Sequence, residues 1–341
     1  MSRTLLNLSL TTTLCGGAAF AEVPKVAVDI APLHSLVARV MENVGTPALI
    51  MEPGSSPHEY SLRPSEAKAL QESDLVFWIG PDLTPWLSDG IETLASKAVV
   101  TGLLEADGTI ELEFREGALF EAHAHDDHDD DEHDDHAEDG HDDHDEHAED
   151  GHDDHDDHED HAEDDHSEHN HGAHDPHAWL SPDNAMTWLN VIAGQLSSAD
   201  PENAGTYFAN AAAARAEIEV LIGEVNATLE PARGGAFIVF HDAYQYFEKS
   251  FDFPASGAIS IGDASDPSPA RIAEIQARIA KENIDCVLAE PQYNSGLVAT
   301  VLDGTGAKTG ILDPLGFGIE PGPELYPELI RSLSNTLAEC L

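Results

Sequence analysis

The N-terminal part of the chain alternates short apolar runs with stretches in which apolar residues recur every three or four positions. The short runs predict buried strands, and the wider spacing predicts amphipathic helices. The predicted strands are 25–30, 47–51, 75–79 and 98–101. Helices are predicted to begin at Pro32 and at Ser65, and a third is predicted over 86–96. Because strands alternate with helices, the pattern predicts a parallel, doubly wound sheet.

A long helical pattern lies in the middle of the chain. A helix is predicted over 184–196, and Asp200 and Pro201 then provide the cap and the first-turn proline of another. From Tyr207 to Leu229 the apolar residues keep helical spacing. This predicts a helix of about 29 residues and about 43 Å, long enough to run along two lobes.

The remaining residues repeat the alternation of strands and helices. Strands are predicted at 236–240, 284–289 and 309–312, and helices at 243–250, 269–281, 296–303 and 324–338. We therefore predict an α/β fold of two doubly wound lobes joined by a long backbone helix, with a disordered His/Asp-rich loop in the first lobe. The predicted limits are 1–21 for a signal peptide, 22–200 for the N-terminal lobe with its disordered metal-binding loop at 121–174, 201–230 for the connecting helix and 231–341 for the C-terminal lobe.

An acidic, histidine-rich run interrupts the first lobe. Residues 121–175 hold 28 of the 66 acidic residues and no Lys or Arg, and they include an eleven-residue repeat that starts at His136 and again at His147. The run has too few apolar side chains to offset the entropy of ordering its backbone. A solvated linker would explain the acidity, but the recurring imidazoles favour low-affinity capture of zinc, copper or nickel. The candidate loop ligands are His123, His125, His128, His133, His136, His141, His144, His147, His152, His155, His158, His161, His166, His169, His171 and His174.

The charge of the chain restricts its partners. The formal charge is −51, and outside the run 38 acidic and 15 basic residues still leave −23. Such a surface favours cations and makes nucleic acid and anionic lipid poor partners.

The first 21 residues predict export. Arg3 precedes an apolar stretch, and Ala19 to Ala21 form a small-x-small cleavage site. No later stretch approaches 18 uninterrupted apolar residues, so we expect no stable membrane insertion. Cys286 and Cys340 remain after cleavage. In an oxidising compartment they are a candidate disulfide, and the alternative is one buried thiol in a strand and one at a frayed terminus.

Three of the four histidines outside the run lie where a ligand would bind. His58 and His241 follow predicted strands, as does Asp313, and His177 follows the long loop. Ligands of open α/β sheets bind beyond the carboxyl ends of the strands. Three imidazoles and one carboxylate suit tetrahedral zinc, so these four residues form a candidate metal site. His34 lies in the first turn of its helix, off the apolar face, and we expect it to be a surface or helix-end residue and not a ligand.

Five short motifs resemble those of periplasmic zinc-binding proteins, the solute receptors of zinc-uptake ABC transporters (the cluster A-I, or cluster 9, receptors). The motifs are Pro57-His58-Glu59-Tyr60, Asp175-Pro176-His177-Ala178-Trp179-Leu180-Ser181-Pro182, His241-Asp242-Ala243-Tyr244, Glu290-Pro291-Gln292 and Asp313-Pro314-Leu315-Gly316. The resemblance covers essentially all of residues 22–341. It implies two lobes around a metal, with His58, His177 and His241 as ligands, and it implies a disulfide between Cys286 and Cys340. We thus expect a Gram-negative periplasmic receptor, monomeric and not an enzyme, that binds Zn²⁺ and delivers it to a membrane permease with its ATPase.

Several alternatives remain open. Manganese-binding relatives look similar but carry a glutamate where this chain has His241, and a harder oxygen ligand suits manganese or another divalent metal. The fourth ligand is Asp313, or instead Glu59 or water. A periplasmic zinc buffer would need only the loop, and would leave the two lobes unexplained. A zinc hydrolase would need a positioned base, and the chain has no HExxH helix.

Overall fold

The structure is a computed structural model of the 341-residue chain, and it describes residues 22–115, 117, 120, 174–260 and 267–341. The chain divides into two units, one of which is formed by residues 1–120 and 172–341 and holds all the helices and strands described below. The predicted signal peptide and the loop histidines from His123 to His171 lie outside the described residues. Within the described ranges, no helix is both long and apolar enough to cross a membrane.

Four parallel strands form the first sheet, in the order β2-β1-β3-β4. The strands are β1 (Val26–Val28), β2 (Ala48–Leu49), β3 (Leu75–Trp78) and β4 (Val99–Gly102). The connecting helices are α1 (Ala31–Val40), α2 (Pro64–Gln71) and α3 (Pro85–Leu94). We call this sheet with its three helices the first lobe. Proline in the first turn of each helix fixes φ where no backbone N–H partner is needed.

A second sheet has the same strand order, β6-β5-β7-β8, and is also parallel. Its strands are β5 (Phe237–His241), β6 (Ala258–Ser260), β7 (Cys286–Ala289) and β8 (Lys308–Ile311). Its connecting helices are α6 (Gln245–Phe251), α7 (Pro269–Glu282) and α8 (Ser295–Leu302). We call these elements the second lobe. The doubly wound pattern predicted from the sequence is therefore confirmed in both halves of the chain.

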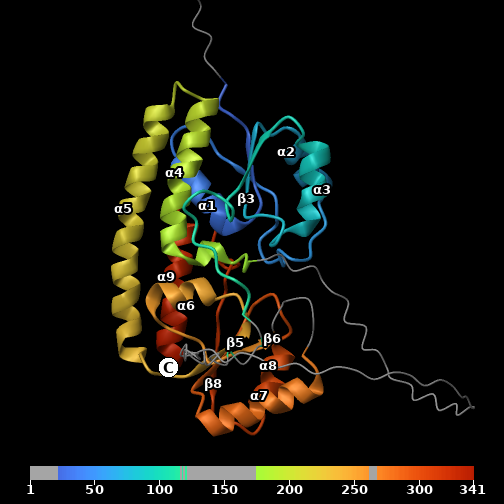
Figure 1. Cartoon of the computed structure of the whole chain (residues 1–341), viewed down its shortest axis with the longest axis vertical. Coiled ribbons are helices and arrows are strands. Elements are labelled where there is room, and N and C mark those ends of the chain that lie inside the picture. Colours follow the sequence, from blue (N-terminus) through green and yellow to red (C-terminus); the bar gives the residue numbers. More distant parts are fainter. Residues whose placement is uncertain (1–21, 116, 118–119, 121–173, 261–266) are drawn as a thin grey trace, which may run out of the picture. The chain divides into compact units, whose positions relative to one another are not determined.

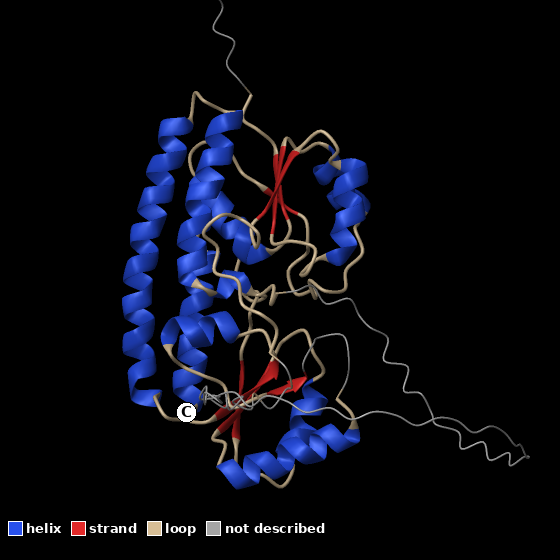
Figure 2. Ribbon diagram, viewed as in Figure 1, coloured by secondary structure: helices blue, strands red, loops and turns tan. Residues whose placement is uncertain are grey.

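Alternation along the strands gives each sheet two apolar faces. In β5, Phe237 and Val239 belong to one buried cluster and Ile238 and Phe240 to another, because successive side chains point to opposite faces. In the first lobe, Val28 and Ala27 are divided in the same way. Figure 2 shows helices on both sides of the strands. Buried apolar area on both faces is the main stabilising term for such sheets.

Three long helices pack along the two sheets. They are α4 (Pro182–Ala199), α5 (Ala204–Leu229) and α9 (Leu325–Cys340). Short 3-10 turns, η1 (Ala178–Leu180) and η2 (Glu230–Ala232), precede α4 and follow α5. Helix α5 packs against both α4 and α9, and in Figure 1 α4 lies along the upper part of α5 and α9 along its lower part. One buried cluster includes residues of α1, α4, α5, α9 and both sheets, so the two lobes share a core.

The predicted disulfide is present between Cys286 of β7 and Cys340 of α9, with 5.9 Å between the Cα atoms. It ties the last residues of the chain to the second sheet.

The structure corrects three sequence-based expectations. Helix α5 begins at Ala204 instead of 201. Asp200 is buried at the end of α4, and its carboxylate accepts a hydrogen bond from the hydroxyl of Tyr207 at 2.9 Å. Strand β6 was not predicted, since three residues are too few to show a period. His34 lies in the first turn of α1 but is buried, at 6% exposure, and its Nε2 lies 3.2 Å from the carbonyl oxygen of Pro47.

Candidate metal centre

His241 is the last residue of β5, at the carboxyl edge of the second sheet, and is 3% exposed. The neighbouring strand β7 ends at Ala289, which places the buried Glu290 beside it. Oε1 of Glu290 lies 2.7 Å from Nδ1 of His241 and also accepts its backbone N–H at 3.3 Å. Gln292 donates to the other carboxylate oxygen at 2.8 Å. A carboxylate at this distance holds a proton on Nδ1, so the lone pair of a neutral ring is on Nε2.

His177 is oriented by the same device in a different element. It precedes η1, and Oδ1 of Asp175 lies 2.7 Å from its Nδ1 and accepts its backbone N–H at 3.0 Å. Both side chains are buried. Trp179 packs its ring 5.3 Å from the imidazole and donates its indole N–H to the carbonyl of Pro314. The imidazole therefore has a fixed plane and an acceptor at Nε2.

His58 comes from the loop between β2 and α2 and is the most accessible of the three. The loop is held by Trp86 of α3, whose indole N–H donates to the carbonyl of Pro57 at 2.7 Å. The backbone N–H of His58 donates to Oγ of Ser56 at 3.2 Å. His58 and Glu59 also line an open pocket of about 580 Å³. This pocket gives a path from solvent to the histidine.

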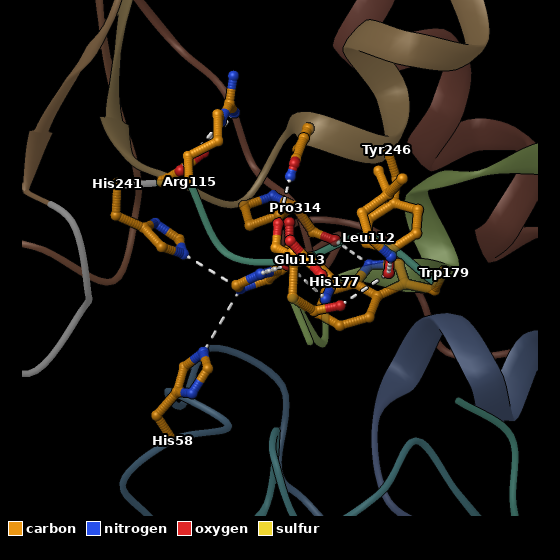
Figure 3. A network of polar contacts seen from close by, with 12 residues as sticks. His58, Leu112, Glu113, Arg115, His177, Trp179, His241, Tyr246 and Pro314 are labelled. Carbon is orange, nitrogen blue, oxygen red and sulfur yellow. Dashed lines mark hydrogen bonds and ion pairs between the residues drawn. The ribbon is translucent and has the colours of Figure 1, made fainter. Parts of the chain in front are cut away.

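The three imidazoles converge through Nε2 (Figure 3). Nε2 of His177 lies 3.4 Å from Nε2 of His58 and 3.4 Å from Nε2 of His241. Among the described residues, these three form the group of at least three His, Cys, Asp or Glu side chains whose ligand atoms lie within 4.8 Å of one another. The sequence-predicted histidines are thus brought together from the first lobe, the turn before α4 and the second lobe.

The spacing fits a cation between the rings. Because the Nδ1 atoms of His177 and His241 face carboxylates, their Nε2 lone pairs face each other, which is unfavourable without a positive charge. Zinc binds imidazole nitrogen at about 2.0–2.1 Å, and two such bonds at a tetrahedral angle place the nitrogens about 3.3–3.4 Å apart. The observed separations match that geometry.

Asp313 and Glu59 lie outside the three-histidine group. Asp313 Oδ1 accepts the backbone N–H groups of Leu315 and Gly316 at 2.9 and 3.0 Å, and Oδ2 accepts that of Phe317 at 2.6 Å. Asp313 therefore shapes the turn after β8, while Glu59 is exposed beside His58. The fourth ligand stays a prediction.

Of the candidate loop ligands, His174 alone lies within the described residues. Its Nδ1 is 3.3 Å from a carboxylate oxygen of Glu111, and it forms an antiparallel bridge with Glu113.

Negative charge surrounds the histidines. Asp175, Glu290, Asp242 and Glu248 are all buried, with Arg115 beside the last two. Burial raises the pKa of Asp242 to about 6, although Arg115 opposes the shift. A cation bound between the rings would thus be stabilised by several carboxylates that do not contact it.

Sequence reasoning found the three histidines but missed the two carboxylates that orient them. Asp175 and Glu290 stand inside the quoted motifs, and Glu290 directly follows a strand adjacent to the strand of His241. Metal-binding histidines usually donate their second ring nitrogen to a carboxylate, so an acidic residue at each of these places was the available signal.

The comparisons with known proteins agree along the whole chain. The family model ZnuA, described as zinc-uptake complex component A periplasmic, matches residues 26–340. The chain is 45% identical over 327 residues to the high-affinity zinc uptake system protein ZnuA of Brucella abortus (strain 2308), covering 96% of this chain and 94% of the relative. It is 44% identical over 322 residues to the protein of the same name from Paracoccus denitrificans (strain Pd 1222), covering 94% and 93%. A crystal structure of ZnuA has the same fold, with a TM-score of 0.69 at 20% identity over 93% of this chain and 99% of that one.

Proposed function

Because this chain belongs to the ZnuA family of periplasmic zinc-uptake components, we propose that it is a high-affinity zinc receptor. Its cargo is Zn²⁺, bound through Nε2 of His58, His177 and His241. The observation that carries the proposal is the 3.4 Å spacing of these nitrogens, with two of the rings oriented by buried carboxylates. The receptor delivers zinc to an ABC permease with its ATPase and performs no chemistry on the ion.

Three imidazoles favour zinc over manganese. Imidazole is a borderline ligand that suits zinc, whereas manganese prefers carboxylate and water oxygens. We propose Asp313 as the fourth ligand, with Glu59 and water as the alternatives. Asp313 can take this role only with a lone pair that its three backbone donors leave unused. Zinc affinities of Asp313→Asn and Glu59→Gln chains test the two carboxylates. Because Asp313 also holds the turn at Phe317, Asp313 as the ligand predicts a larger loss in Asp313→Asn than in Phe317→Ala, whereas water as the ligand predicts no such excess and little change in Glu59→Gln.

We further propose that the chain is exported to the periplasm, with residues 1–21 removed, and acts there as a monomer. In the mature chain, the proposed limits are 22–200 for the N-terminal lobe, 201–230 for the connecting segment that contains α5, and 231–341 for the C-terminal lobe. The sixteen histidines from His123 to His174 collect or sense zinc at lower affinity, because ordering a loop around a metal costs backbone entropy. A chain lacking 121–173 should therefore bind fewer zinc ions in total but keep one tight site, and loss of the tight site would contradict this division.

The experiment that tests the function is zinc affinity measured by competition with a chelator. His241→Ala should weaken the tight site by at least about 100-fold, because a tetrahedral site loses one of its protein ligands. His34→Gln is the matched control, since His34 is also a buried histidine outside the acidic run but lies apart from the group. Equal affinities of the wild-type and His241→Ala chains would contradict the assignment. Tighter binding of manganese than of zinc would favour a manganese receptor.

A further inference from the structure

The segment that carries His177 is hydrogen-bonded to a second segment that ends at Arg115. An isolated antiparallel bridge between Glu113 and His174 joins residues 112–115 to residues 174–177, and the backbone N–H of Asp175 donates to the carbonyl of Leu112 at 2.8 Å. We call these eight residues the ribbon. Because these contacts join the two segments, a residue that fixes one segment of the ribbon also restrains the other, and with it the imidazole of His177.

Helix α6 of the second lobe holds the ribbon through its first two residues. The hydroxyl of Tyr246 accepts the backbone N–H of Leu112 and donates to the carbonyl of Asp175, both at 2.9 Å. The side-chain amide of Gln245 donates to the carbonyl of Glu113 at 2.9 Å. The segment that leads to His177 is therefore anchored to the second lobe, which also carries His241.

Arg115 makes the strongest of these connections. Its Nε donates to Asp242 at 3.0 Å, its Nη1 and Nη2 donate to the two oxygens of Glu248 at 2.9 Å, and Nη2 also contacts Asp242. The two carboxylates are 8% and 6% exposed, and the ring of Phe120 lies 3.6 Å from the centre of the guanidinium. Charge-assisted, multiply bonded arginine pairs of this kind fix geometry as well as contributing energy.

The position of Asp242 connects this ion cluster to the metal centre. Asp242 directly follows His241, and the backbone N–H of Ala243 donates to the carbonyl of His241 at 2.9 Å, so the turn is tight. Arg115 thus joins the ribbon of His177 to the turn of His241. In the His58 loop, the carbonyl of Pro57 accepts from Trp86 and the hydroxyl of Tyr60 donates to Glu66, both within the first lobe.

We propose that Arg115 is a positioning residue of the metal site. It keeps Nε2 of His177 and Nε2 of His241 at the spacing that lets both bind one ion, and so slows the release of the ion. The inference rests on the proposed zinc site. Arg115 does not contact the ion. It acts by holding the ribbon and the turn after β5 in one arrangement, and its loss would leave two buried carboxylates without their counter-ion. Replacement of residues that orient metal ligands typically costs 10–100-fold in metal affinity.

The test is the rate of zinc release from the full chain into excess chelator. The tight site is defined as the slow phase that His241→Ala removes. Arg115→Gln should accelerate this phase by at least about tenfold, and Arg115→Lys, which keeps the charge but loses the fork of donors, should give an intermediate rate. Rates are compared at one temperature that lies well below the Tm of every metal-free chain, so that global unfolding does not contribute to release.

Arg39 provides a matched control. It also joins two carboxylates on different elements, Glu42 and Glu217, at 2.7 Å, and its side chain is 15% exposed against 20% for Arg115. Arg39→Gln should leave the slow phase within about twofold of wild type, since it lies away from the metal ligands. Equal acceleration by the two variants, or a wild-type rate for Arg115→Gln, would overturn the proposal. If Arg115→Gln does not fold, a wild-type rate for Arg115→Lys would overturn it equally. A wild-type chain without a slow phase that depends on His241 would instead contradict the zinc site itself.

Discussion

At the residue scale, the metal centre depends on the protonation of single ring nitrogens. Glu290 and Asp175 each face an Nδ1 at 2.7 Å and each also accept the backbone N–H of the same histidine. This double contact fixes both the ring and the main chain of the ligand. The histidine then meets the ion without first losing side-chain entropy, which favours tight binding.

Glu290→Gln should weaken zinc binding by about 10–100-fold. The amide oxygen can still accept a hydrogen bond from Nδ1–H, but it lacks the negative charge that increases the basicity of Nε2. Chelator competition measures the effect, with Glu274→Gln as the control because Glu274 is half-exposed and pairs with Arg271. A change of less than about twofold in Glu290→Gln would show that the carboxylate does not act on the ligand.

Asp29 gives a prediction about pH. It is fully buried at the end of β1, and burial raises its pKa to about 7, against backbone N–H bonds from Ile79 and Ile30 that lower it. The folded state therefore holds the Asp29 proton more tightly than the unfolded state does between about pH 4 and pH 7. Its contribution to the free energy of unfolding is largest at low pH and is lost as the pH rises towards 7, by up to about 1.4 kcal/mol per pH unit.

Denaturant unfolding of the metal-free chain at several pH values tests this contribution. Asp29→Asn should be less stable at every pH, since an amide cannot accept from both backbone donors, but its stability should depend less on pH between 5 and 7 than that of the wild type. The difference between the two chains removes the opposing effect of His34, whose pKa burial lowers. Parallel pH curves for the two chains would show that Asp29 does not titrate in this range.

At the scale of elements, the turns that follow β2 and β8 contact each other. A Cβ at Gly54 would lie 2.2 Å from Cε2 of Phe317, and Gly54 has a φ of +86°. The ring of Phe317 thus packs directly on the backbone of the loop that carries His58. Asp313 holds the other side of this contact by accepting the backbone N–H of Phe317. The pairing gives Asp313 a structural role whether or not it binds the ion.

Phe317→Ala should increase the rate of zinc release about fivefold. Phe317 is 53% exposed, so about half of its apolar surface is buried in this contact. Loss of that buried area costs about 1 kcal/mol of contact free energy, which corresponds to the expected change in rate. Gly54→Ala should displace the same ring and have a similar effect on release, with an added loss of about 1 kcal/mol in stability from the positive φ. The double variant should release zinc no faster than the faster single variant. Additive effects would show that the two residues act separately.

The sequence predicted the elements best where the period was long or the signal was chemical. The helices at α4, α7 and α9 and the strands at β1, β3 and β5 were found because a period of 3.6 or a run of buried residues extends over several positions. Strand β6 was not found because three residues are too few to show a period. The start of α5 was not found because it depends on the burial of Asp200 and its hydrogen bond from Tyr207. The carboxylate partners of the ligands depend on strand neighbours, which a single sequence does not reveal.

At the scale of the whole molecule, the metal centre joins parts of the chain that are far apart in sequence. His58 comes from the first lobe and His241 from the second, while His177 is held by the ribbon on α6. The two lobes that carry these histidines share a buried core with α4, α5 and α9, and the disulfide joins β7 to α9. A site that needs all three parts at once is sensitive to any change in their arrangement.

Zinc K-edge X-ray absorption of the full chain, loaded with one equivalent of zinc, tests the central claim most directly. We expect a four-coordinate ion with three imidazole nitrogens at about 2.0–2.1 Å, and the loss of one imidazole from the shell in a His241→Ala chain. A zinc shell of mainly oxygen ligands, or a shell that is unchanged in the His241→Ala chain, would contradict it.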